Sequence, residues 1–241
     1  VMYTGVIPYG EPEFVPGEVL PTDTRPCTVF SVTFVAKLKD RHIPCIQIKG
    51  SAMFGATEYL TVIDEPVSLM VTSIDWALWN DHYDIEVISY NGGWRFRGVV
   101  GLFADYIDKW SEIKQNSTGA MREIAKLHLN SLYGKLCSNP NVTGKIPVLG
   151  DDEIVRYTRG IDSRKNPVYT AAGVFITSLA RDMTIRAAQD NYDYFAYADT
   201  DSLHLLTETV PSGLDIHPKR MGAWKLEYEF EEAHFVRAKA Y

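Results

Sequence analysis

Residues 194–206 read YFAYADTDSLHLL, in which two short apolar runs flank Asp199-Thr200-Asp201. Each run has the length and composition of a strand, and aspartate favours the turn between them. The stretch therefore predicts two antiparallel strands joined at an acidic turn. Residues two apart in an extended chain point to the same side, so we expect the carboxylates of Asp199 and Asp201 to lie together.

The sequence before this hairpin changes from strand patterns to helix patterns. Strands are expected at 28–35 and 84–90, and Asn91-Gly92-Gly93 is expected to form a turn into 94–97. Residues 138–168 contain several turn dipeptides, which predict short hairpins.

Three helices are predicted from the apolar spacing. They cover residues 102–113, about 120–133 and 171–189, with a break at 116–119 and Gly134 as a left-handed C-cap. Together these elements predict an α+β fold with helices packed on an antiparallel sheet.

The composition is that of a globular protein. The chain has 241 residues, 46% hydrophobic and 23% charged, which excludes disordered, collagen-like and coiled-coil classes. The net charge of −7 excludes a broadly basic surface, yet residues 111–145 hold five basic and two acidic side chains, a local +3. Charge can be segregated in this way, so binding of a polyanion by that segment is compatible with the composition.

Cysteine usage and hydropathy bear on localisation. Three scattered cysteines are too few for a disulfide framework or a zinc site. There is no apolar run of bilayer length and no signal-peptide pattern in the first residues. We expect a soluble cytoplasmic protein without a membrane partner.

The acidic turn is a candidate metal site. Apolar runs on both sides predict that Asp199 and Asp201 lie at the end of a buried hairpin, where two carboxylates repel unless a cation or proton separates them. Magnesium accepts one or two carboxylates and completes its shell with substrate phosphates. A solvated turn without function has the same spacing, so the pattern alone leaves both interpretations open.

The helix at 120–133 is a candidate polyanion site. Arg122, Lys126 and Asn130 recur every four residues and Tyr133 follows one turn later, so all four share one face. Two cations, an amide and a ring in a row suit a nucleoside triphosphate, although a solvated amphipathic face with a buried tyrosine would look the same. Apolar residues on the other side are expected to face a core: Met121, Ile124, Ala125 and Leu132.

Three motifs in order resemble those of B-family DNA polymerases. Residues 126–134 (KLHLNSLYG) are similar to Lys-x-x-x-Asn-Ser-x-Tyr-Gly, 197–202 (YADTDS) to Tyr-x-Asp-Thr-Asp-Ser, and 239–241 (KAY) to Lys-x-Tyr. Further stretches are similar to the protein-primed branch of phages and linear plasmids: residues 7–12, 101–103 and 138–140.

The resemblance implies a DNA-directed DNA polymerase and assigns a role to each motif residue. Asp201 would bind both catalytic metals, Mg²⁺ or Mn²⁺, with Asp199 as its less central neighbour. In the nucleotide site, Lys126 would contact the triphosphate, helped by Lys114 and by Arg122, which stands where the family carries lysine. Tyr133 would pack against the incoming nucleotide, with Asn130 supporting it. Two residues would hold the primer terminus: Lys239 and Tyr241.

The resemblance also implies partners and a division of the chain. The partners would be a DNA primer–template, dNTPs and a terminal priming protein. Residues 1–105 would form the palm edge and a first β-rich insertion, which contacts terminal protein and DNA. Residues 106–138 would form the helical fingers, and residues 139–168 a second insertion for strand displacement and processivity. The antiparallel palm would take up residues 169–241.

The family's first metal motif, Asp-x-x-Ser-Leu-Tyr-Pro, is not found in the sequence. We therefore expect an internal palm–fingers fragment without exonuclease or thumb, an incomplete two-metal site, and weak or no activity of the isolated chain. The alternative is a non-catalytic module that binds DNA or terminal protein, which the net charge of −7 favours slightly.

Overall fold

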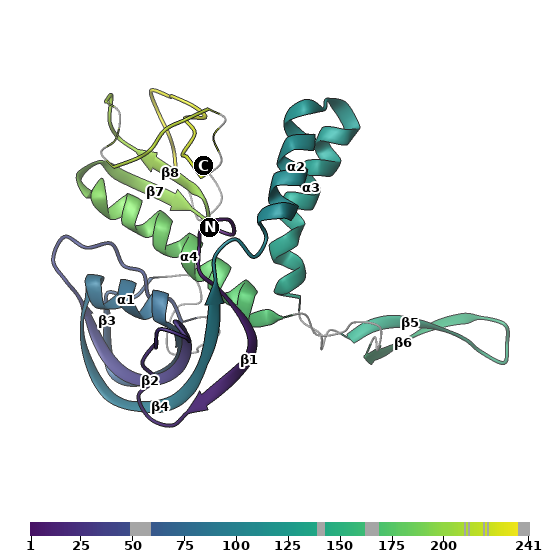
Figure 1. Ribbon diagram of the computed structural model, residues 1–241, viewed down its shortest axis with the longest axis horizontal. Coiled ribbons are helices and arrows are strands. Elements are labelled where there is room, and N and C mark those ends of the chain that lie inside the picture. The colour runs from purple at the N-terminus through teal and green to yellow at the C-terminus, as the bar shows by residue number, and fades with distance from the viewer. Residues whose placement is uncertain are drawn as a thin grey trace. The chain divides into compact units, whose positions relative to one another are not determined.

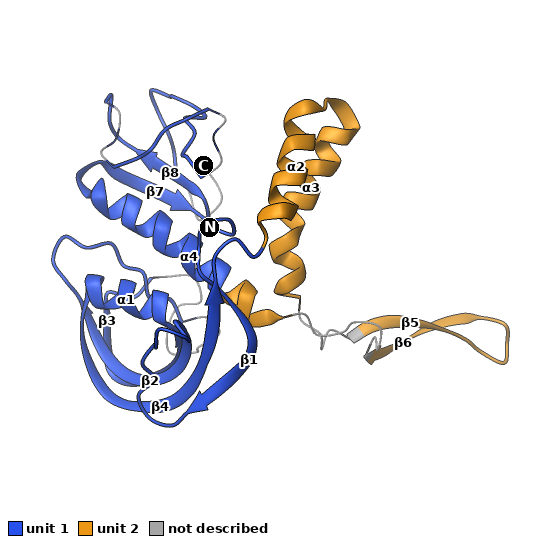
Figure 2. Ribbon diagram, viewed as in Figure 1, with its two compact units in different colours: residues 1–102, 175–241 blue, residues 103–174 orange. Residues whose placement is uncertain are grey.

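The computed structural model describes residues 1–48, 59–138, 143–161, 169–209, 211, 213–218, 220 and 222–235. The chain divides into two compact units, residues 1–102 with 175–241, and residues 103–174 (Figure 2). The predicted parts 1–105 and 169–241 thus fall largely in one unit and the two middle parts largely in the other. The functions assigned to the four parts stay predictions.

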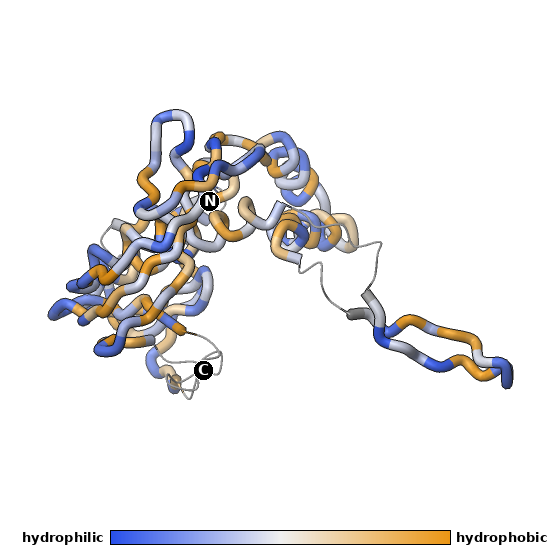
Figure 3. The backbone as a smooth tube through the Cα atoms, turned by 90° about the horizontal axis from the view of Figure 1, so that it is seen from below, coloured by the Kyte–Doolittle hydropathy of each residue, from blue (hydrophilic) through white to orange (hydrophobic). Residues whose placement is uncertain are grey.

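The first unit is built on a four-stranded antiparallel sheet in the order β1-β4-β2-β3 (Figure 1). Buried and half-buried residues alternate along β2, which explains why Thr28–Val35 was recognisable as a strand. In Figure 3, hydrophobic and hydrophilic residues are interspersed along the strands of this sheet. The strands are β1 (Ile7–Val15), β2 (Cys27–Leu38), β3 (Val62–Thr72) and β4 (Tyr83–Val99).

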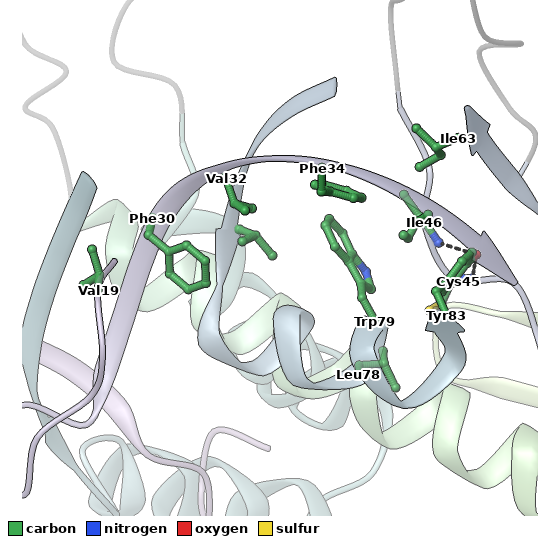
Figure 4. Close-up of a cluster of buried hydrophobic side chains, with 12 residues drawn as sticks. Val19, Phe30, Val32, Phe34, Cys45, Ile46, Ile63, Leu78, Trp79 and Tyr83 are labelled. Atoms are coloured by element: carbon green, nitrogen blue, oxygen red, sulfur yellow. Dashed lines mark hydrogen bonds between the residues drawn. The ribbon is translucent and has the colours of Figure 1, made fainter. Parts of the chain in front are cut away.

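Helix α1 (Ser73–His82) lies in the hollow of the curled sheet and covers its core face (Figure 1). Phe30 and Phe34 of β2 contact the Trp76 ring edge-on, at centroid distances of 5.9 and 5.7 Å. Trp79 and Leu78 complete the contact from the helix (Figure 4). The tryptophans of α1 therefore belong to the core.

Tyr83 closes the end of this core. Its hydroxyl accepts hydrogen bonds from the backbone N–H groups of Cys45 and Ile46 (Figure 4). The same hydroxyl donates to the Leu60 carbonyl. Burial raises the pKa of Tyr83 to about 12, so the phenol stays neutral and keeps its proton for that last bond.

Helix α4 (Thr170–Asp190) is anchored to α1 by a buried carboxylate. Asp75 is 5% exposed, and Arg181 donates to both of its carboxylate oxygens at 2.8 and 2.9 Å. Ser178 and Thr72 donate to Oδ2 at 2.6 and 2.9 Å. Bidentate pairing of this kind fixes geometry as well as charge, so α4 is held in one register along α1.

The chain after α4 forms the predicted hairpin. A 3₁₀ turn (Tyr192–Tyr194) leads into β7 (Phe195–Asp199), which pairs antiparallel with β8 (Ser202–Leu205). The predicted helix and both predicted strands are confirmed, and with the antiparallel sheet of the same unit they confirm the α+β class.

The second unit contains two helices and a separate hairpin. Helices α2 (Ala104–Asn116) and α3 (Gly119–Leu136) are joined at the predicted break. Strands β5 (Thr143–Leu149) and β6 (Val155–Ile161) form an antiparallel hairpin as predicted. The rest of the predicted insertion, residues 139–142 and 162–168, lies outside the described residues.

Two local predictions about glycines were wrong. Asn91-Gly92-Gly93 does not end a strand, because β4 runs through it with a shift of register opposite β2. Gly134 is not a left-handed C-cap, because α3 continues to Leu136 and Cys137 caps it. A Gly-Gly pair serves a bulge as well as a turn, and a helix tolerates a single glycine when other residues favour the helix.

Most of the apolar core predicted for α3 is also absent. Ala125 is fully buried, but Met121 and Ile124 are 51% and 44% exposed. The reason is that α3 packs mainly against α2, through the face that carries Ala125, and Met121 and Ile124 on its flank are not covered by a further layer of described residues. Among the described residues, no helix is long and apolar enough to cross a membrane.

A paired glycine substitution tests the account of β4. A Cβ added to Gly93 would lie 2.5 Å from the Cα of Phe30, whereas one added to Gly134 would meet nothing within 4 Å. Gly93→Ala should lower the free energy of unfolding by about 2–4 kcal/mol, and Gly134→Ala should raise it by about 0.5–1 kcal/mol. Urea denaturation measures both. Equal effects of the two substitutions would contradict the bulge.

The buried imidazole of His82 should make stability depend on pH. His82 is 2% exposed and hydrogen-bonds the Ile43 carbonyl through Nδ1 at 2.8 Å. Burial lowers its pKa in the folded state, so below about pH 6.5 the unfolded chain takes up this proton first. Stability should therefore fall as the pH drops from 6.5 through the folded-state pKa.

The matched variant is His82→Asn, which keeps a donor for the Ile43 carbonyl but has no proton to gain. Its free energy of unfolding should fall less between pH 7.5 and 5.5 than that of the parent chain, as measured in urea. The same slope in both proteins would show that His82 does not contribute.

Candidate functional site

The acidic turn closes the β7–β8 hairpin with two residues. Asp199 pairs with Ser202, which leaves Thr200 and Asp201 as the loop. Thr200 has φ +56°, in the left-handed region that β-branched residues rarely adopt. A backbone of this kind persists only where neighbouring contacts hold it.

Hydrogen bonds around the Asp199 carbonyl hold the turn. Asp201 N–H donates to that oxygen at 2.7 Å, and the Ser202 hydroxyl donates to it at 3.0 Å. The Thr200 hydroxyl donates to the Asp199 carboxylate at 3.0 Å. A further bond comes from α4, where Thr184 Oγ1 lies 3.1 Å from the Thr200 carbonyl.

The two aspartates differ in their surroundings. Asp199 is half-buried and Asp201 is exposed. Within the part of the chain that the structure describes, the Asp201 carboxylate has no hydrogen-bond or ion-pair partner. Strands β7 and β8 are half-buried throughout, so the expectation of a buried hairpin was wrong. The period-two argument for the pair also fails, because Asp201 lies in the turn rather than in extended chain.

The turn offers oxygen ligands but no complete metal shell. Over the described ranges, no group of three or more His, Cys, Asp or Glu side chains is placed to hold a metal ion. Two carboxylates, one of them unpaired, fit a hard divalent cation that takes its remaining ligands from water and phosphates. They do not fit zinc, which in proteins is bound by three or four His, Cys or carboxylate ligands.

The predicted cationic face lies on the α2–α3 helix pair. Arg122, Lys126 and Asn130 are exposed at successive turns of α3, and Tyr133 is 39% exposed. Arg122 Nη1 donates to the Lys114 carbonyl at 3.0 Å, which brings the end of α2 to the start of this face. All five predicted nucleotide-binding residues therefore belong to one helix pair.

A ring stack fixes the two helices against each other. The rings of Trp110 and His128 are parallel at a centroid distance of 3.8 Å. The Tyr106 hydroxyl reaches both the His128 ring and its carbonyl at 3.1 Å. Trp110 thus has an intramolecular partner, and the stack sets which side of α3 faces outward. We did not single out His128 in the sequence, and nothing in the spacing signals it.

The remaining predicted site residues, Lys239 and Tyr241, lie outside the described residues. The two described groups belong to different units, Asp199 and Asp201 to the first and the cationic face to the second. Gly150-Asp151-Asp152 forms the loop between β5 and β6, where Asp152 pairs with Arg156. Gly-Asp-Asp also resembles a signature of RNA polymerases, but here it lies in a hairpin loop.

Comparisons with known proteins agree on one family. Residues 1–215 match the family described as DNA polymerase type B, organellar and viral. The DNA polymerases of Bacillus phages Nf and phi29 are 43% and 42% identical over the whole chain, and that of Streptococcus phage Cp-1 is 33% identical. The chain spans 42–43% of the length of these relatives.

Solved structures give the same result. Phi29 DNA polymerase complexed with primer-template DNA and incoming nucleotide substrates matches with a TM-score of 0.84 and 42% identity. The match covers 92% of this chain and 40% of that one. The complex of the same polymerase with primer-template DNA alone gives a TM-score of 0.83.

Proposed function

The chain belongs to the type B DNA polymerases of organelles and viruses, and we propose that it carries the metal-binding turn and the nucleotide-binding helix of such an enzyme. The observation that carries the proposal is the Asp201 carboxylate, which lies unpaired, within the described chain, at the tip of the β7–β8 hairpin. In the motif that this turn matches, the corresponding aspartate binds the catalytic metals.

The reaction would be DNA-templated nucleotidyl transfer. The primer 3′-hydroxyl loses its proton to water, and its oxygen forms a bond to the α-phosphorus of a dNTP. The bond from that phosphorus to the oxygen that bridges the α- and β-phosphates breaks, and pyrophosphate leaves. Bound Mg²⁺ or Mn²⁺ would stabilise the attacking and leaving oxygens. Asp201 would hold the ion with its exposed carboxylate, and Asp199 would act as the neighbouring carboxylate.

The cationic face of α3 would bind the triphosphate. Lys126 extends from an exposed turn of the helix, where its ammonium group suits the charge of the phosphates. Arg122 and Lys114 would assist from one turn before and from the end of α2. The Tyr133 ring would pack against the base or sugar, with Asn130 beside it. A nucleoside triphosphate needs charge at one end of its site and a ring at the other. On α3 the charged residues Arg122 and Lys126 lie at one end of the face and Tyr133 lies at the other.

Primer–template DNA and a terminal priming protein are proposed as macromolecular partners. Related phi29 polymerase structures hold primer-template DNA, which supports the first partner. The protein-primed stretches of sequence support the second. Residues 106–138 would act as fingers, 1–105 and 139–168 as the two insertions, and 169–241 as the palm, with Lys239 and Tyr241 on the primer.

The alternative is a non-catalytic module that binds DNA or terminal protein. The net charge of −7 favours it, because binding of duplex DNA rests on neutralising phosphates. Such a module has no use for a metal-dependent dNTP site. Metal-dependent nucleotide binding therefore separates the two functions.

Binding of a dNTP to the 241-residue chain in the presence of Mn²⁺ tests the proposal. Asp201→Asn and Lys126→Ala should each weaken binding about tenfold or more, because each removes a charged contact to the ion or the phosphates. Isothermal titration calorimetry gives the affinities, and EDTA should abolish binding by the parent chain. Primer extension, where it occurs, should disappear with Asp201→Asn.

Two matched controls are present in the same chain. Lys135 lies on α3 nine residues after Lys126, on the opposite face of the helix. Asp151 occupies the other acidic hairpin loop and is likewise exposed. Lys135→Ala and Asp151→Asn should leave binding unchanged. Metal-independent dNTP binding, or none by the parent chain, would favour the alternative function.

A further inference from the structure

The peptide unit between Thr200 and Asp201 is held at both of its polar ends. Its N–H, which belongs to Asp201, donates to the Asp199 carbonyl at 2.7 Å. Its carbonyl, which belongs to Thr200, accepts from the Thr184 hydroxyl at 3.1 Å. The first bond is local to the turn, whereas the second comes from helix α4.

The Thr184 hydroxyl lies within hydrogen-bond distance of two carbonyls. Thr184 is 6% exposed, and its hydroxyl has one proton to donate. The Ala180 carbonyl also lies 3.1 Å from Oγ1, but it already accepts the helical N–H of residue 184. The Thr200 carbonyl is therefore the acceptor for which the hydroxyl makes a difference.

The two dihedral angles that flank this peptide, ψ of Thr200 and φ of Asp201, determine where the Asp201 side chain points. When both change in a compensating way only the peptide plane turns, but a change in one that the other does not compensate moves the Asp201 Cβ. Thr200 sits at φ +56°, a conformation that its side chain does not favour. The bonds within the hairpin hold this conformation from one side of the peptide, and the bond from Thr184 holds it from the other.

Helix α4, from which that contact comes, is itself held in place by its hydrogen bonds to Asp75. Ser178 and Arg181, the two anchors to Asp75, precede Thr184 by six and three residues. Asp75 begins α1, which covers the sheet core. The hydroxyl of Thr184 therefore connects the acidic turn to the most firmly packed part of the unit.

We propose that Thr184 is a positioning residue for the Asp201 carboxylate, acting through the carbonyl of Thr200. This inference rests on the proposed function, since it assigns Thr184 to the same metal-binding turn. Its hydroxyl touches neither metal nor substrate, and its role is to hold the Thr200–Asp201 peptide in the orientation that presents the carboxylate.

Three variants of the 241-residue chain test the role. Thr184→Val keeps the branched shape and removes the hydroxyl, and Thr184→Ser restores the hydroxyl. Thr28→Val is the matched control, because Thr28 is fully buried and its hydroxyl has no partner among the described residues. A general effect of losing a buried hydroxyl would appear in the control as well.

The first readout is the order of the turn, which does not depend on function. The NMR order parameter of the Asp201 amide should be about 0.85 in the parent, Thr184→Ser and Thr28→Val chains, and should fall below about 0.6 in Thr184→Val. An unchanged value in Thr184→Val, or an equal fall in Thr28→Val, would overturn the proposal.

The second readout is Mn²⁺ affinity, followed by paramagnetic broadening of the Asp201 and Ser202 resonances. The dissociation constant should rise about fivefold in Thr184→Val and return to the parent value in Thr184→Ser. If the turn loses order without losing affinity, Thr184 does not position the carboxylate. If the parent chain binds no Mn²⁺ at the turn, the proposed function fails, while the order parameter still decides whether Thr184 holds the peptide.

Discussion

The first unit depends on the buried carboxylate of Asp75. Asp75 accepts hydrogen bonds from Arg181, Ser178 and Thr72, and these bonds connect the helix that covers the sheet core to the helix that leads into the acidic turn. Removing Arg181 would leave the Asp75 charge unpaired in a low-dielectric site, which typically costs about 3–5 kcal/mol. Because the contact joins α1 and α4, it holds the sheet core and the β7–β8 hairpin in fixed positions relative to each other. The proposed metal-binding turn would need to be held in this way, since small displacements of a carboxylate weaken its hold on an ion.

The second unit follows a different principle. Its helices meet through one fully buried alanine, Ala125, and through the Trp110–His128 stack. A thin interface of this kind leaves both flanks of α3 open to solvent, one apolar and one cationic. Local basic charge on an acidic protein attracts phosphates without favouring nucleic acid everywhere on the surface. The α2–α3 helix pair therefore exposes many of its side chains to solvent and encloses little core.

Much of this architecture could be predicted from periodicity, because each strand or helix carries its own pattern. The β7–β8 hairpin, the three helices and the α2–α3 break all follow from residues close together in the sequence. The predictions at Gly93 and Gly134 were wrong because glycine occurs in turns, in bulges and inside helices. Only the surrounding structure shows which of these a given glycine belongs to. Thr72 and Asp75 form a capping pattern that signals the start of α1, but no local pattern signals Arg181, which lies 106 residues away. The candidate site residues on α3 share a local spacing that the sequence shows, and their roles stay predictions, whereas no local pattern signals the contact from Thr184 to Thr200.

The discontinuous course of the first unit has a consequence for how the chain is made and how it varies. Residues 103–174 interrupt a unit whose two segments are held together by α1 and α4. During synthesis, the Asp75 site stays incomplete until α4 emerges, so docking of α4 must wait for it. Bringing the two segments of the first unit together closes residues 103–174 into a loop. The entropic cost of closing such a loop grows only slowly with its length, by about 0.6 kcal/mol for each doubling. The interrupting segment is therefore free to lengthen or shorten, above all at the β5–β6 hairpin, with little effect on the stability of the sheet.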